Sequence, residues 1–127
     1  MAEKKKILLI DDDETSLELT ANMLKKEYEI AIARSGQEAL NYLIQQSIPD
    51  LLLLDILMPE MDGWETYKKI KGISLLKDVP IAFLTAIEET TEENRAYQMG
   101  IDDYIRKPYT QKELFDRVAA LLEKNKK

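Results

Sequence analysis

One stretch decides the fold: Pro49-Asp50-Leu51-Leu52-Leu53-Leu54-Asp55-Ile56-Leu57-Met58-Pro59. Its short apolar run has no alternation, which is typical of a strand buried on both faces of a parallel sheet. Asp55 follows the run directly, so its carboxylate is expected where the buried strand reaches the surface. In open α/β sheets this edge, at the carboxyl ends of the strands, is where ligands bind. Pro59 and then Asp62-Gly63 end the extended segment in a turn.

Strand and helix patterns alternate along the rest of the chain. Further strands are predicted at 7–10, 80–85 and 104–108, and an alternating pattern predicts one at 29–33, near an edge. Helices are predicted after Asp13, after Ser35, at about 64–70, at 88–99 and after Thr110. The spacings Ser35–Glu38 and Thr110–Glu113 have the form of capping boxes, and Asp13 is a plausible N-cap. Five strand–helix units predict an α/β fold, a doubly wound five-stranded parallel sheet with helices on both faces.

The helical periodicity also predicts which helix residues are buried. Those of the first, second and last helices are Leu17, Thr20, Ala21, Leu24 and Tyr28; Ala39, Leu40, Leu43 and Ile44; and Leu114, Phe115, Val118, Leu121 and Leu122. The segment Glu88 to Met99 has little apolar surface beyond Ala96 and Met99, with Gly100 as its stop. We therefore expect this fourth helix to be weakly anchored, and either to move or to be completed by a partner.

Length and composition limit the functions that the chain can have. Its 127 residues fit one domain over 1–127, with a core from about 6 to 122 and a charged tail at 123–127. The absence of cysteine and histidine excludes disulfides, a catalytic triad, a histidine metal site and a self-contained phosphohistidine step. The net charge of −6 argues against nucleic acid as a direct partner. No apolar run approaches the roughly 20 residues that cross a membrane, and no signal peptide is evident, so a cytoplasmic protein is expected.

Reactive side chains end four of the predicted strands. They are the pair Asp11-Asp12, then Asp55, Thr85 and Lys107. Any one of them alone has an ordinary explanation as a turn, cap or solvated residue, and Asp13 and Asp62 are assigned to that class. Together, at one edge of a parallel sheet, three carboxylates would repel one another, and a divalent cation such as Mg²⁺ would relieve the repulsion. The hydroxyl and the lysine then complete a site where one carboxylate could attack phosphorus.

The chain resembles the receiver domain of two-component response regulators, the family that includes the chemotaxis protein CheY. The resemblance extends from Lys6 to about Leu122. It implies the flavodoxin-like (CheY-like) strand order 2-1-3-4-5. The motifs that carry it are Ile10-Asp11-Asp12, Asp55 followed by Met58-Pro59 and Asp62-Gly63, Thr85-Ala86, and Lys107-Pro108.

The resemblance implies a role for each matching position. Asp55 matches the phosphoacceptor, and Lys107, before a proline with a cis bond, matches the lysine that pairs with phosphoryl oxygen. Thr85 matches the hydroxyl that binds the phosphoryl group, with Ala86 the small residue beside it. Tyr104 matches the switch aromatic, which can turn inward when Thr85 moves. The metal ligands for Mg²⁺ (or Mn²⁺) would be Asp11, Asp12, Asp55 and the backbone carbonyl of Leu57.

The implied function is a phosphorylation-activated signalling switch rather than a dedicated enzyme. A sensor histidine kinase or a histidine phosphotransfer protein would supply the phosphoryl group, and the domain would only phosphorylate and dephosphorylate itself. The output would be binding of a downstream protein or output domain through the 88–99 helix, the Tyr104 strand and the C-terminal helix. Leu57 and Ile87 are apolar at positions that tune hydrolysis in the family, which suggests a long-lived phosphoryl state.

Two other classes of protein remain as alternatives. A magnesium-dependent phosphohydrolase also forms an aspartyl phosphate, but it would need an acid at position 57, where this chain has Leu57. A flavin-binding electron carrier would need a hydroxyl- and glycine-rich phosphate loop after the first strand, where this chain has Asp11, Asp12 and Asp13.

Overall fold

The computed structural model describes residues 4–45, 48–87 and 90–124, and within them five parallel strands form one sheet. The strand order is β2-β1-β3-β4-β5, which confirms the order expected from the family resemblance and the edge position of the second strand. The strands are β1 (Lys6–Ile10), β2 (Glu29–Ala33), β3 (Leu51–Leu54), β4 (Ile81–Thr85) and β5 (Asp103–Arg106).

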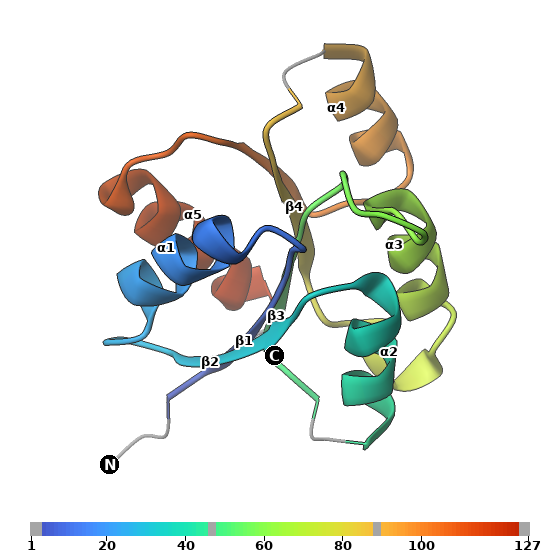
Figure 1. The fold of residues 1–127 in the computed structure, drawn as a ribbon, viewed down its shortest axis with the longest axis horizontal. Coiled ribbons are helices and arrows are strands. Elements are labelled where there is room, and N and C mark those ends of the chain that lie inside the picture. The colour runs from blue at the N-terminus through green and yellow to red at the C-terminus, as the bar shows by residue number, and fades with distance from the viewer. Residues whose placement is uncertain (1–3, 46–47, 88–89, 125–127) are drawn as a thin grey trace.

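Helices cover both faces of this sheet, as Figure 1 shows. Successive side chains of a strand point to opposite faces, so Ile7 and Leu9 pack on one face while Leu8 and Ile10 pack on the other. The helices α1 and α5 lie on the first face, and α2, α3 and α4 on the second. Their bounds are α1 (Glu14–Leu24), α2 (Gly36–Gln45), α3 (Gly63–Lys71), α4 (Thr90–Gln98) and α5 (Gln111–Lys124), with a short 3₁₀ helix η1 (Ser74–Leu76).

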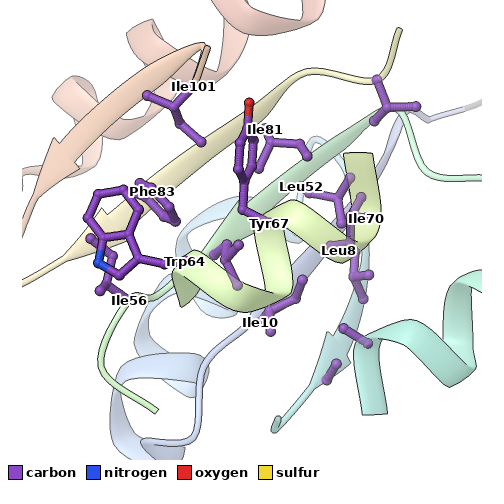
Figure 2. Close-up of a cluster of buried hydrophobic side chains, with 14 of the residues drawn as sticks. Leu8, Ile10, Leu52, Ile56, Trp64, Tyr67, Ile70, Ile81, Phe83 and Ile101 are labelled. Atoms are coloured by element: carbon purple, nitrogen blue, oxygen red, sulfur yellow. The ribbon is translucent and has the colours of Figure 1, made fainter. Parts of the chain in front are cut away.

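Phe83 is the centre of an aromatic group in the core beneath α3. Its ring meets the ring of Trp64 edge-on, with 5.0 Å between centroids, and also contacts the rings of Tyr67 and Tyr104. Figure 2 shows Trp64, Tyr67 and Ile70 on the side of α3 that faces the sheet. Edge-on ring contacts add to the stabilisation from burial, so this group fixes α3, and the loop before it, against β3 and β4.

The predicted caps are present at three helix starts. The Asp13 carboxylate accepts a hydrogen bond from the Thr15 N–H at the start of α1. Thr110 and Glu113 form a reciprocal capping box before α5, with bonds of 3.0 and 3.3 Å. At α2 the Ser35 hydroxyl accepts from the Glu38 N–H, but the Glu38 carboxylate accepts from the N–H of Arg34, one residue earlier than the pattern predicts.

One prediction of a buried residue was wrong, and another residue lies outside its predicted helix. Ile44 is 74% exposed, because α2 turns its Ala39–Leu40–Leu43 stripe to the sheet and Ile44 points away from it. Tyr28 does not lie on α1, which ends at Leu24, although it still packs on the ring of Phe115 from the following loop.

Several predicted boundaries also differ from the structure. The last strand ends at Arg106 rather than 108, and α5 runs through Lys124 into the predicted tail. Residues 125–127 and the predicted start of the fourth helix at residues 88–89 lie outside the described residues. Gly100 has φ of +99°, which confirms it as the stop after α4. In the part of the chain described, no helix is both long and apolar enough to span a bilayer.

Candidate functional site

Three carboxylates meet at the carboxyl ends of β1 and β3. The two strands are neighbours, and the N–H of Asp55 donates a hydrogen bond to the carbonyl of Ile10, directly before Asp11. One carboxylate oxygen from each of Asp11, Asp12 and Asp55 lies within 4.8 Å of the others. Asp11 and Asp55 are buried and Asp12 is exposed, so the cluster opens to solvent on the side of Asp12.

Lys107 supplies the positive charge of this cluster. Its Nζ donates to Asp11 Oδ2 at 2.8 Å and to Ser16 Oγ at 2.6 Å, and lies 3.9 Å from Asp55 Oδ2. The peptide bond between Lys107 and Pro108 is cis, as the family resemblance implies. The structure therefore brings four of the predicted site residues together from β1, β3 and the segment after β5.

Burial makes the Asp55 carboxylate costly to ionise. Burial, and then the negative charge of Asp11, raise the pKa of Asp55 to about 6, although the nearby Lys107 and the Thr85 hydroxyl act in the opposite direction. Among the described residues, its Oδ1 is buried without a hydrogen-bond partner. A buried oxygen of this kind is a ready ligand or nucleophile because no other group competes for it.

The pKa of Asp11 shifts in the opposite direction, although Asp11 is buried beside Asp55. Burial alone would raise the pKa of Asp11, but hydrogen bonds from Lys107 and from the N–H of Asp13 outweigh it and lower the pKa. The site therefore pairs a carboxylate stabilised as the anion with one that is not. A hard divalent cation suits this donor set, because oxygen ligands are what Mg²⁺ prefers and Asp55 Oδ1 accepts a hydrogen bond from none of the described residues.

The remaining predicted residues differ in their relation to the acidic cluster. Thr85 ends β4, next to β3, and is fully buried, with its Oγ1 accepting from the N–H of Ile87 at 3.3 Å. Tyr104 is already directed inward: it is 2% exposed and its hydroxyl donates to the Ile87 carbonyl at 3.0 Å. The Leu57 side chain is 61% exposed and takes no part in the cluster, so only its carbonyl is a candidate ligand.

Ser16 is a site residue that the sequence reasoning missed. It lies in the first turn of α1, one position before the buried Leu17, and its hydroxyl binds the Lys107 amino group. The available signal was its place in the sequence: it lies in the first turn of the helix that follows Asp11 and Asp12, next to the buried Leu17. A serine there, by itself, is too common to have been singled out.

Comparisons with known proteins agree with this geometry. The family model described as "Response regulator receiver domain" matches residues 7–119. The response regulator MprA of Mycobacterium tuberculosis is 37% identical over 122 residues, which are 95% of this chain and 52% of MprA. The alkaline phosphatase synthesis transcriptional regulatory protein PhoP of Bacillus subtilis is 35% identical, over 95% of this chain and 50% of PhoP. The chain thus spans about half the length of these curated relatives.

A solved structure also matches nearly the whole of this chain. The chemotaxis protein CheY4 of Vibrio cholerae superposes with a TM-score of 0.87 at 25% identity, covering 94% of this chain and 99% of that one. All the strand ends that form the acidic cluster lie within the matched family segment.

Proposed function

Because the chain belongs to the family of response regulator receiver domains, we propose that it is a switch activated by phosphorylation of Asp55. A sensor histidine kinase or a histidine phosphotransfer protein would be the donor, since this chain contains no histidine of its own. The observation that carries the proposal is the unpaired, buried Oδ1 of Asp55 beside Lys107 and two further carboxylates.

The proposed step is a transfer of the phosphoryl group from nitrogen to oxygen. A carboxylate oxygen of Asp55 forms a bond to phosphorus while the bond from phosphorus to the donor imidazole nitrogen breaks, and its electron pair stays on that nitrogen. The Lys107 ammonium, 3.9 Å from Asp55 Oδ2, donates to a phosphoryl oxygen, and the Thr85 hydroxyl donates to another.

The carboxylates of Asp11, Asp12 and Asp55 would hold Mg²⁺ or Mn²⁺, with the Leu57 carbonyl as a further ligand. The bound ion would neutralise negative charge shared by the carboxylates and the phosphoryl group. Asp11 also pairs with Lys107, so it links the proposed metal site to the proposed phosphoryl site.

The switch would pass through Thr85 and Tyr104 to α4. Thr85 would move to the phosphoryl group and shift the segment at Ile87, whose N–H it binds and whose carbonyl accepts from the hydroxyl of the already inward Tyr104. Within α4 only Ala96 is buried, so this helix is weakly anchored and can shift at low cost. The proposed output is a protein contact on α4, β5 and α5, in a partner or in another part of a longer chain.

Several narrower predictions belong to the same proposal. Residues 1–127 would work as one receiver domain whose only chemistry is its own phosphorylation and dephosphorylation, and the apolar Leu57 and Ile87 would lengthen the life of the phosphoryl group. The cytoplasmic location also stays a prediction. The family match gives no support to the phosphohydrolase or the flavin carrier.

The test is phosphorylation by acetyl phosphate with Mg²⁺, followed by mass mapping of the labelled peptide. Wild type should gain one phosphoryl group on the peptide with Asp55, and Asp55→Asn should gain none. Asp78→Asn, which removes an exposed acid distant in sequence, should label as wild type does. Label on any other residue of wild type, or on Asp55→Asn to the same extent, would contradict the proposal.

A further inference from the structure

Two hydroxyl groups on α1 face the segment that carries Lys107. The Ser16 Oγ accepts from Lys107 Nζ at 2.6 Å, and one helical turn later the Thr20 hydroxyl forms a hydrogen bond with the hydroxyl of Tyr109. Residues four apart on a helix lie on the same face. Helix α1 therefore contacts the Lys107–Tyr109 segment at two points, although the two segments are about ninety residues apart in the sequence.

Ser16 also borders the acidic cluster itself. It lines a small cavity of about 10 Å³ whose polar walls include Asp11, Thr20 and Asp55. Ser16 also lines a second pocket together with Lys107 and Ala86. Its side chain is only partly exposed. Ser16 thus lies beside both the carboxylates and the lysine, although it comes from the first turn of α1 and not from a strand end.

We propose that Ser16 is a positioning residue that holds the Lys107 amino group where it can meet a phosphoryl group on Asp55. An ammonium group has three donors, and here Asp11 and Ser16 accept two of them. Asp55 Oδ2, at 3.9 Å, is beyond hydrogen-bond distance, so among the described residues the third donor has no acceptor and is available to a phosphoryl oxygen on Asp55. This inference rests on the function proposed above.

The benefit comes from ordering a flexible side chain before the reaction. A lysine side chain loses much rotamer freedom when its amino group is fixed, and that loss slows a step in which the group must be in place. Asp11 alone is a shared anchor, because its carboxylate also belongs to the proposed metal site. Ser16 is neutral, so it can hold Lys107 whether or not Asp11 binds a cation.

The test compares the rate of Asp55 phosphorylation by acetyl phosphate and Mg²⁺ in Ser16→Ala, Ser16→Thr and wild type. Loss of one hydrogen bond of ordinary net strength predicts a rate about three- to tenfold lower for Ser16→Ala. Ser16→Thr keeps the hydroxyl and should stay near the wild-type rate. Thr15→Ala removes an exposed hydroxyl from the same turn and is the matched control.

A second readout does not depend on phosphorylation. In nitrogen-15 NMR of the unphosphorylated proteins, the hydrogens on Lys107 Nζ should exchange with water more slowly in wild type and Ser16→Thr than in Ser16→Ala. A structural role in α1 alone would not change this exchange. Urea denaturation of each variant checks that it is folded.

The outcomes separate this inference from the proposed function. Wild type labelled on Asp55, with Ser16→Ala labelled as fast or faster, would overturn the role of Ser16 and leave the proposed function standing. A slow rate in Ser16→Thr as well as in Ser16→Ala would also overturn it, since the hydroxyl would not be the cause. Wild type without label on Asp55 would overturn the proposed function, and with it the positioning role.

Discussion

Replacing Asp55 by asparagine should stabilise the metal-free protein at neutral pH. The folded protein raises the pKa of Asp55 from 3.8 to about 6, with burial as the largest cause. Between these two values the folded state binds the proton more tightly than the unfolded chain does. The free energy of unfolding of wild type should therefore fall as the pH rises through this interval, and Asp55→Asn should lack that fall.

The size of the effect follows from the shift in pKa. Each pKa unit corresponds to about 1.4 kcal/mol, so the charged Asp55 costs the folded state about 3 kcal/mol at pH 7. We expect a net gain of about 1–3 kcal/mol for Asp55→Asn, because the amide must still be buried and Lys107 loses one of its negative neighbours. The pKa of Asp11 is lowered, so its contribution to stability is lost only at more acidic pH.

Urea denaturation with a chelator present, at several values between about pH 4 and about pH 7.5, measures this difference. The two proteins should have similar stability near pH 4 and should diverge as the pH rises. Asp78→Asn is the control, and should stay within about 0.5 kcal/mol of wild type throughout. The reasoning is refuted if the free energy of unfolding changes with pH equally in wild type and Asp55→Asn, or if Asp55→Asn is less stable than wild type at pH 7.

Three further substitutions test the packing that supports the site. Phe83→Ala should cost about 3–5 kcal/mol in urea denaturation, since the ring is fully buried among other aromatic rings. Ser35→Ala should cost about 1 kcal/mol by the same measurement, because the Glu38 N–H loses its cap at the start of α2. Gly63→Ala should cost about 1–3 kcal/mol and slow phosphorylation, because the new Cβ would lie 2.4 Å from the carbonyl oxygen of Asp55.

Each of these substitutions has a matched control elsewhere in the chain. Leu75→Ala also shortens a large apolar side chain, but this leucine is 77% exposed, so the change should cost little. Ser74→Ala removes a hydroxyl from an exposed serine. Gly72→Ala places a Cβ no closer than 3.4 Å to another residue. If a control destabilises the protein as much as its partner, the packing argument for that partner is wrong.

The alternation of strands and helices could be predicted from the sequence because its signals are local. Leu51 to Leu54 lack alternation since both faces of β3 are covered, and all four are buried. The cap at Asp13 depends only on residues within one turn of the chain. The meeting of Asp11 with Asp55 followed from the rule that parallel strands end at one edge.

The tertiary structure alone decided which neighbouring side chains are buried and which distant ones meet. Asp11 is buried and Asp12 exposed, although the two acids are adjacent and chemically identical. Ile44 is apolar and close to the buried stripe of α2, but the angle at which that helix lies on the sheet directs it outward. The contact between Ser16 and Lys107 joins α1 to the segment after β5. Local sequence sets the backbone conformation and the spacing of apolar residues in each helix or strand. Contacts between distant residues depend on how these elements pack together, and no short stretch of sequence encodes that packing.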